Sequence, residues 1–189
     1  MSRYSPRTLT AQSSIANWGK AGGPPAGKVP ATITYSVTAG NGGGGGAQFA
    51  YPFNGGSGCG GANASGTYTT LSARDYYVTV GAGGNAGVST NTGACASGGG
   101  AGGSSTFGIF TAAGGGGGAG ACGDHAGNCA GGAGQQSAGN AGSVVITYTQ
   151  TDTTELATIP VGLTYSLSTN AVVGSYRYTF TAGSGLVQF

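Results

Sequence analysis

The side chains best suited to chemistry lie together in one short stretch, CGDHAGNC, at residues 122–129. It holds the chain's single histidine, His125, with Asp124 beside it and Cys122 and Cys129 at its ends. Cysteine, histidine and aspartate are zinc ligands, but structural zinc sites usually take their ligands from two separated pairs. The spacing between these two cysteines is not one of the usual ones. We therefore expect no metal site here.

Catalytic arrangements find less support still. The acidic residues are Asp75, Asp124, Asp152 and Glu155. Their spacing suggests no carboxylate pair. His125 could act as the base for a serine, but no Gly-x-Ser-x-Gly elbow lies between a strand and a helix. The GAGGNAG run at 81–87 is superficially like a dinucleotide-binding loop, yet no helix is expected after it. We expect a protein that is not an enzyme and has no cofactor.

Aromatic and amide side chains on loops remain as candidates for recognition. Aromatic rings stack on sugars or pack on apolar patches, and Asn, Asp and His side chains form directional hydrogen bonds. Loops held by a rigid scaffold often carry binding residues. The expected receptor-binding residues are Tyr51, Phe53, Asn54, Asn91, Asp124, His125 and Asn128. In the alternative reading, Tyr51 and Phe53 only cover a sheet.

The cysteines are a second feature with alternatives. They are Cys59, Cys95, Cys122 and Cys129. Two disulfides would staple a chain whose core is poor in side chains. Cys122 with Cys129 would close a small loop and leave Cys59 with Cys95, one of the three pairings that four cysteines allow. The other reading is four free, buried thiols.

Glycine dominates the composition, with 44 of 189 residues, yet the chain does not have the composition of a disordered protein. Hydrophobic residues make up 38% and charged residues only 5%. Disordered chains usually combine high net charge with few aromatic residues. Glycine loses the most backbone entropy on folding and buries no side chain. The glycine runs are therefore expected to form extended helices of polyproline II shape that pack and hydrogen-bond side by side. On this view Gly116→Val should destabilise the fold.

The charges argue against several classes of partner. The cations are Arg3, Arg7, Lys20, Lys28, Arg74 and Arg177, and the net charge is +2. They form no stripe that could neutralise many phosphates, so we expect no nucleic-acid binding. No apolar run reaches the length of a membrane span. The first 19 residues lack the apolar core of a secretory signal, so we expect a protein made without a signal peptide.

Alternating short runs predict an all-β fold. Strands are expected at 31–39, 67–72, 76–80, 106–111 and 143–149, and three more runs at Leu163–Ser168, Tyr176–Thr181 and Leu186–Phe189. We expect short antiparallel strands combined with polyglycine-type runs, plus a small C-terminal β-meander. The expected units are a docking arm (1–30) anchored by Trp18, a glycine-rich domain (31–149), a connector (150–159) and the meander (160–189).

Two segments carry a resemblance to a known family. The YVTVGAGG run at 77–84 and the stretch Ser104–Gly118, SSTFGIFTAAGGGGG, each join a short strand to glycines. Their order within 31–149 resembles the glycine-rich domain of bacteriophage structural proteins, which include tail-tip and tail-fibre adhesins and minor tail proteins. The resemblance implies a lattice of polyglycine helices with variable loops that meet a host receptor.

The resemblance, together with these observations, implies a non-enzymatic virion structural protein at the particle surface, in a tail tip or tail fibre, contributing to host recognition. Such a protein is expected to be made in the host cytoplasm without a signal peptide. Its expected partners are other virion proteins, further copies of itself in a trimer, and a host receptor or glycan, without membrane insertion. One alternative is a capsid decoration or head-fibre protein anchored by the N-terminal arm. Another is an ice-binding or cell-wall glycine-rich protein.

Overall fold

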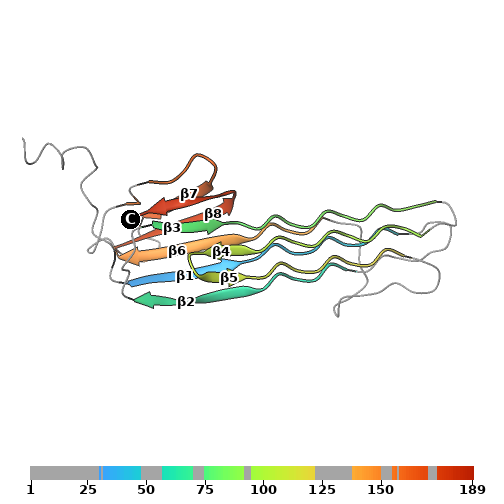
Figure 1. Ribbon diagram of the computed structural model, residues 1–189, viewed down its shortest axis with the longest axis horizontal. Helices are drawn as coiled ribbons and strands as arrows, with labels where there is room; N and C mark the ends of the chain where they lie inside the picture. Colours follow the sequence, from blue (N-terminus) through green and yellow to red (C-terminus); the bar gives the residue numbers. More distant parts are fainter. Residues whose placement is uncertain are drawn as a thin grey trace, which may run out of the picture.

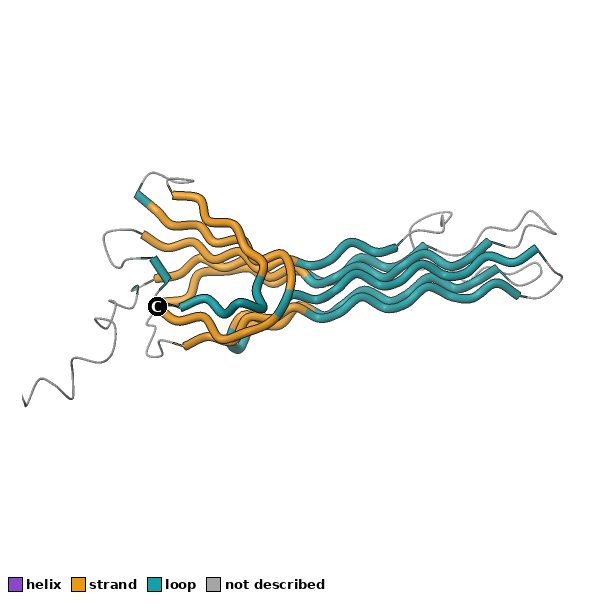
Figure 2. Tube along the Cα trace, turned by 90° about the horizontal axis from the view of Figure 1, so that it is seen from above, coloured by secondary structure: helices purple, strands orange, loops and turns teal. Residues whose placement is uncertain are grey.

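The computed structural model describes residues 30, 32–47, 57–69, 75–91, 95–121, 138–149, 155–156, 158–169 and 174–189. These residues form an all-β structure with two antiparallel sheets and, within the described ranges, no helix. The expected fold class is confirmed in this respect. Figures 1 and 2 show the sheets at one end of the molecule and a bundle of extended glycine-rich chain at the other.

The larger sheet has the order β2-β1-β6-β8-β7. Its strands are β1 (Thr32–Thr38), β2 (Asn63–Thr69), β6 (Ser143–Thr149), β7 (Thr164–Thr169) and β8 (Ser175–Ala182). The smaller sheet has the order β5-β4-β3-β9. Its strands are β3 (Asp75–Thr79), β4 (Ser105–Phe107), β5 (Phe110–Ala112) and β9 (Ser184–Gln188).

A period of two in the sequence decides which side chains enter the core. In β6, the run SVVITYT buries Val144, Ile146 and Tyr148 and leaves the residues between them partly exposed. In β1, Ile33 and Val37 are buried in the same way. Successive side chains of a strand point to opposite faces, so one face becomes apolar and packs against the other sheet.

Aromatic rings fill the space between the two sheets. Phe107 of β4 is fully buried, and its ring stacks on that of Tyr76 at a centroid distance of 5.2 Å. Tyr35 of β1 stacks on Phe110 of β5 at 4.0 Å. Phe189 contacts the ring of Tyr76 edge-on. These contacts join strands of both sheets into one hydrophobic core.

The segment 106–111 differs from the single strand expected from its sequence. It is a hairpin, in which Phe107 of β4 pairs with Phe110 of β5 across a two-residue turn. Gly108 in that turn has φ 56°, a left-handed conformation that glycine adopts without a steric penalty. Ile109 beside it is 82% exposed. The apolar character of Ile109 made the turn look like the middle of a strand.

The C-terminal strands also differ from the expected separate meander. β8 pairs with β6, and β9 pairs with β3, so the two strands extend the two sheets that residues 31–149 begin. Gly183, at φ 90°, connects β8 of one sheet to β9 of the other. Residues 160–189 therefore contribute to the same core. Residues 1–29 of the expected arm, including Trp18, lie outside the described residues.

Candidate functional site

Six glycine-rich segments continue from strands of the two sheets and lie side by side in a bundle (Figures 1 and 2). Segments A (39–47), C (80–91) and E (113–121) follow strands β1, β3 and β5 and lead away from the sheets. Segments B (57–62), D (95–104) and F (138–142) lead back into β2, β4 and β6. Each outgoing segment thus alternates with a returning one.

Segment A lies at the centre of the bundle, because it is hydrogen-bonded to all five others. Its amides donate to the returning segments: Gly42 N–H to the Cys59 carbonyl of B at 2.9 Å, for example, and Asn41 N–H to Asn140 of F at 2.9 Å. Its carbonyls accept from the outgoing segments. Gly84 of C donates to the carbonyl of Asn41 at 2.8 Å.

The partners of segment A repeat every third residue. The carbonyls of Gly40, Gly43 and Gly46 accept from segment E. Those of residues 41, 44 and 47 accept from segment C. A three-residue repeat of lateral hydrogen bonds is the pattern of an extended chain with three residues per turn, as in polyproline II geometry.

The five outer segments form an incomplete ring around A. Backbone hydrogen bonds join B to E, E to D, D to C and C to F. Among the described residues, none joins F to B. With neighbours at regular intervals around a three-fold chain, the ring has five places filled and a sixth place open between B and F.

Close packing explains why segment A is almost pure glycine. A Cβ atom on Gly40 or Gly43 would overlap a backbone carbonyl of segment C. A Cβ atom on Gly42 or Gly45 would overlap one of segment E. Asn41 belongs to the third set of positions, the one turned toward the open place in the ring. This is why residue 41 can carry a side chain.

Gly116 shows that not every glycine of a run is enclosed. It is exposed, and the nearest atom to a Cβ added there is the Cys59 Sγ at 3.8 Å. The expectation that a side chain cannot fit at Gly116 is therefore wrong. Its neighbour Gly117 faces segment D, where a Cβ would overlap the carbonyl of Gly99. One residue of every three in an outer segment points to solvent.

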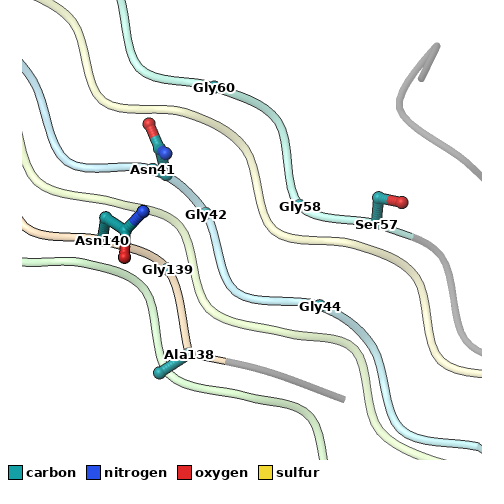
Figure 3. A pocket seen from close by; sticks show the side chains of 9 residues that line it. All are labelled: Asn41, Gly42, Gly44, Ser57, Gly58, Gly60, Ala138, Gly139 and Asn140. Atoms are coloured by element: carbon teal, nitrogen blue, oxygen red, sulfur yellow. The ribbon is translucent and has the colours of Figure 1, made fainter. Parts of the chain in front are cut away.

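The open place between B and F is a polar groove of about 230 Å³. Figure 3 shows Asn41 on its floor and Asn140 on one wall, with Ser57, Gly58 and Gly60 along the other. The Asn41 side-chain Oδ1 accepts a hydrogen bond from Gly61 N–H at 2.9 Å. The groove was not predicted from the sequence. The available signal was Asn41, the one residue with a side chain inside the glycine run of segment A.

The far end of the bundle is formed by the ends of the three outgoing segments. Segments A, C and E end there in the described chain, at residues 47, 91 and 121, and segment D begins at 95 beside them, with Ala96 N–H bonded to the Ala121 carbonyl. Segments B and F begin at 57 and 138, nearer to the sheets (Figure 2). Of the expected receptor-binding residues, only Asn91 is described, and it is exposed in a bend at the end of segment C. The others, Tyr51, Phe53, Asn54, Asp124, His125 and Asn128, lie outside the described residues.

The cysteines are divided between described and undescribed chain. Cys59 lies in segment B and Cys95 in segment D, while Cys122 and Cys129 lie outside the described residues. The described part of the chain contains no free cysteine. The pairing proposed from the sequence remains a prediction.

Ionisable groups of the described chain lie mainly in the sheets, away from the groove. Burial raises the pKa of Tyr148 and of Tyr178, whose hydroxyl groups are hydrogen-bonded to each other. Tyr178 Oη also accepts from Leu156 N–H at 3.0 Å. Within the described ranges there is no group of three or more His, Cys, Asp or Glu placed to hold a metal, and no helix long and apolar enough to cross a membrane.

Comparison with known proteins gives one match. A family model described as a glycine-rich domain covers residues 16–185. The chain belongs to this glycine-rich domain family. The match includes all of β7 and β8 and the start of β9, so it extends past residue 149 into the C-terminal strands that pair with both sheets. No curated protein and no solved structure matches the chain.

Proposed function

We propose that this glycine-rich domain is a non-enzymatic structural protein on the surface of a bacteriophage particle, in a tail tip or tail fibre, where it contributes to host recognition. The observation that supports this best is the arrangement of the bundle. Six extended segments are hydrogen-bonded to one another, and the three outgoing ones end, in the described chain, on the side remote from the sheets.

Rigid support is what a recognition surface needs from its scaffold. Binding residues commonly lie on connections whose ends are fixed by regular structure. Here the ends are fixed by backbone hydrogen bonds, such as Gly46 N–H to the Ser97 carbonyl at 2.9 Å and Ala121 N–H to the Gly46 carbonyl at 3.1 Å. Val88 and Asn91, both exposed near this end, are the described side chains that a receptor would meet.

The resemblance of the segments at 77–84 and Ser104–Gly118 to phage structural proteins supports the virion location. The proposal includes synthesis in the host cytoplasm, contacts with other virion proteins and assembly with further copies, a trimer being the expected form. The sheet end, with the described C-terminal residue Phe189 near it, is the end assigned to attachment (Figure 1).

Immunogold electron microscopy tests the location. An antibody raised against the purified chain would be applied to particles released from lysed cells that carry its gene. Gold at the tail tip or fibre is the expected result. Gold over the head would favour the decoration alternative, and particles without label would overturn a virion role.

Adsorption tests the recognition part of the proposal. Particles carrying Tyr51→Ala with Phe53→Ala should adsorb to their host more slowly than the parent while containing the same amount of the protein. An outward-facing substitution on the bundle shaft, Gly116→Ala, is the matched control and should leave adsorption unchanged. Equal adsorption of all three particles would remove the assigned contact from these loops.

A further inference from the structure

The carbonyl groups of segment A divide into three sets, and only two of them are used. The sets at 40, 43 and 46 and at 41, 44 and 47 accept from segments E and C. The third set, Ala39, Gly42 and Gly45, has no hydrogen-bond donor among the described residues. Each of these three carbonyls is three residues from the next, so all three point in the same direction from the chain. Since the other two directions are those of segments E and C, the third direction is that of the sixth place of the ring.

The walls of the groove present the complementary groups. In segment D, which has neighbours on both sides, Gly99 and Gly102 donate to segment E, and Gly100 and Gly103 donate to segment C. In segment D, therefore, the amides that face one neighbour come one residue before those that face the other. In segment B, Cys59 and Ala62 donate to E, which lies on the side that C occupies relative to D. The amides one residue earlier, at Gly58 and Gly61, are thus on the groove side. Gly58 N–H has no acceptor among the described residues, and Gly61 N–H is bonded to Asn41 Oδ1.

Segment F follows the same rule on the opposite wall. Gly139 and Gly142 donate to segment C. The amide of Asn140 therefore lies on the groove side, and it too has no acceptor among the described residues. Outgoing segments C and E likewise donate to carbonyls of segment A and accept from amides of the returning segments beside them. The groove therefore offers the same kinds of groups as the places that C and E fill.

We propose that the groove binds an extended, glycine-rich peptide segment of a partner chain, which fills the sixth place of the ring as an outgoing strand. Its amides donate to the carbonyls of Gly42 and Gly45, and one of its carbonyls accepts from Gly58 N–H. Like segment E, it has glycine at the two positions of every three that face its neighbours and accepts a side chain at the third. This binding does not depend on the function proposed above.

Asn41 sets the inner limit of this site. Its side chain occupies the groove at the level where a seventh backbone would approach segment A, and it takes the hydrogen bond of Gly61 N–H. The bound segment therefore lies beyond Asn41, over residues 42–46. At about 3.1 Å per residue of extended chain, this accommodates roughly five residues. A short contact of this size gives weak binding on its own.

The probe is a synthetic nonapeptide with the sequence of residues 113–121, AGGGGGAGA, which already fills the equivalent place in segment E. Two matched peptides carry one valine each, at the position of Gly116, which faces solvent, or of Gly117, which faces a neighbouring segment. Binding to the whole ¹⁵N-labelled chain is followed by NMR at millimolar peptide. We expect the unsubstituted peptide and the peptide with valine at position 116 to shift the amide of Gly58. The peptide with valine at position 117 should bind at least about tenfold more weakly.

The protein variant Asn41→Gly provides an independent test. It removes the side chain that ends the groove and should tighten binding of the unsubstituted peptide. Three results would overturn the proposal: no saturable shift with any peptide, equal binding of the two valine peptides, or shifts confined to the edge strands β2, β5, β7 or β9. The last result would show strand addition to a sheet in place of binding in the groove.

Discussion

A Cβ atom on Gly117 would overlap the carbonyl oxygen of Gly99 on the neighbouring segment. The amide of Gly99 donates in turn to the carbonyl of Gly118 at 2.7 Å, so the two backbones are held at a distance that leaves no room for a side chain. Only the residues of segment E that face a neighbouring segment are restricted to glycine in this way, and residues that face solvent are not.

Gly117→Val should therefore destabilise the protein by about 3 kcal/mol, because the backbone of segment D or E must move to admit the side chain. For a domain of this size the loss corresponds to a fall in Tm of roughly 6–12 °C. Gly116→Val is the control, since its side chain points to solvent, and should melt within about 2 °C of the parent. Equal melting of the two variants would refute the proposed packing of segment E.

Ser105→Ala should be destabilising at the junction between sheet and bundle. Ser105 is fully buried, and its Oγ accepts the amide of Gly81 at 2.9 Å, where segment C begins. Alanine leaves that amide buried without a partner, at a cost of about 1–3 kcal/mol. Ser104→Ala is the matched control, because the 3.4 Å contact of Ser104 Oγ with Gly114 N–H is exposed. Chemical denaturation of both variants distinguishes them, and a smaller loss for Ser105→Ala would contradict this account.

Local pattern was sufficient for the features that depend on neighbouring residues. The alternation in SVVITYT predicts β6 at its observed bounds of Ser143–Thr149. The scarcity of charge and the abundance of aromatics predict that the glycine runs belong to the folded structure. The hairpin at Gly108 was missed because Ile109 and Phe110 continue the apolar pattern through the turn.

Features that depend on distant partners were not accessible in the same way. That β9 pairs with β3 is a choice of partner across more than a hundred residues, and nothing in either run specifies it. Which face of a glycine run is enclosed follows from the order of segments around A, because glycine has no side chain to mark a direction. Asn41 was the exception: a single amide within a glycine run marks the position that faces the groove.

Gly183→Ala should be more damaging than Gly174→Ala, although both glycines have positive φ. At Gly174, φ is 72° and nothing lies within 4 Å of an added Cβ, so the cost is the left-handed conformation alone, about 1–2 kcal/mol. At Gly183, φ is 90° and the Cβ would overlap the carbonyl of Gly162. Urea denaturation should show a loss of about 3 kcal/mol or more for Gly183→Ala. A smaller loss there than at Gly174 would contradict the assigned contact.

Alkaline pH should weaken the fold through its buried tyrosines. Burial raises the pKa of Tyr76, Tyr148 and Tyr178 above the ordinary value of 10.0. The unfolded chain therefore loses these protons from about pH 10 upward while the folded chain retains them. The folded state then binds more protons, so the free energy of unfolding falls as pH rises, by up to about 1.4 kcal/mol per pH unit for each tyrosine. The contribution is complete below about pH 10.

Tyr148→Phe isolates one of these groups. Phenylalanine keeps the ring contacts with Tyr178 and Phe189 but has no proton to lose. Between about pH 10 and 11.5, the free energy of unfolding of this variant should fall less steeply than that of the parent, by up to about 1.4 kcal/mol per pH unit. Urea denaturation at several pH values gives both slopes.

Because the hydroxyl of Tyr148 is also hydrogen-bonded to Tyr178, the variant should be less stable than the parent at neutral pH, and the two curves should converge as the pH rises. Parallel curves would mean that Tyr148 ionises alike in the folded and unfolded chain.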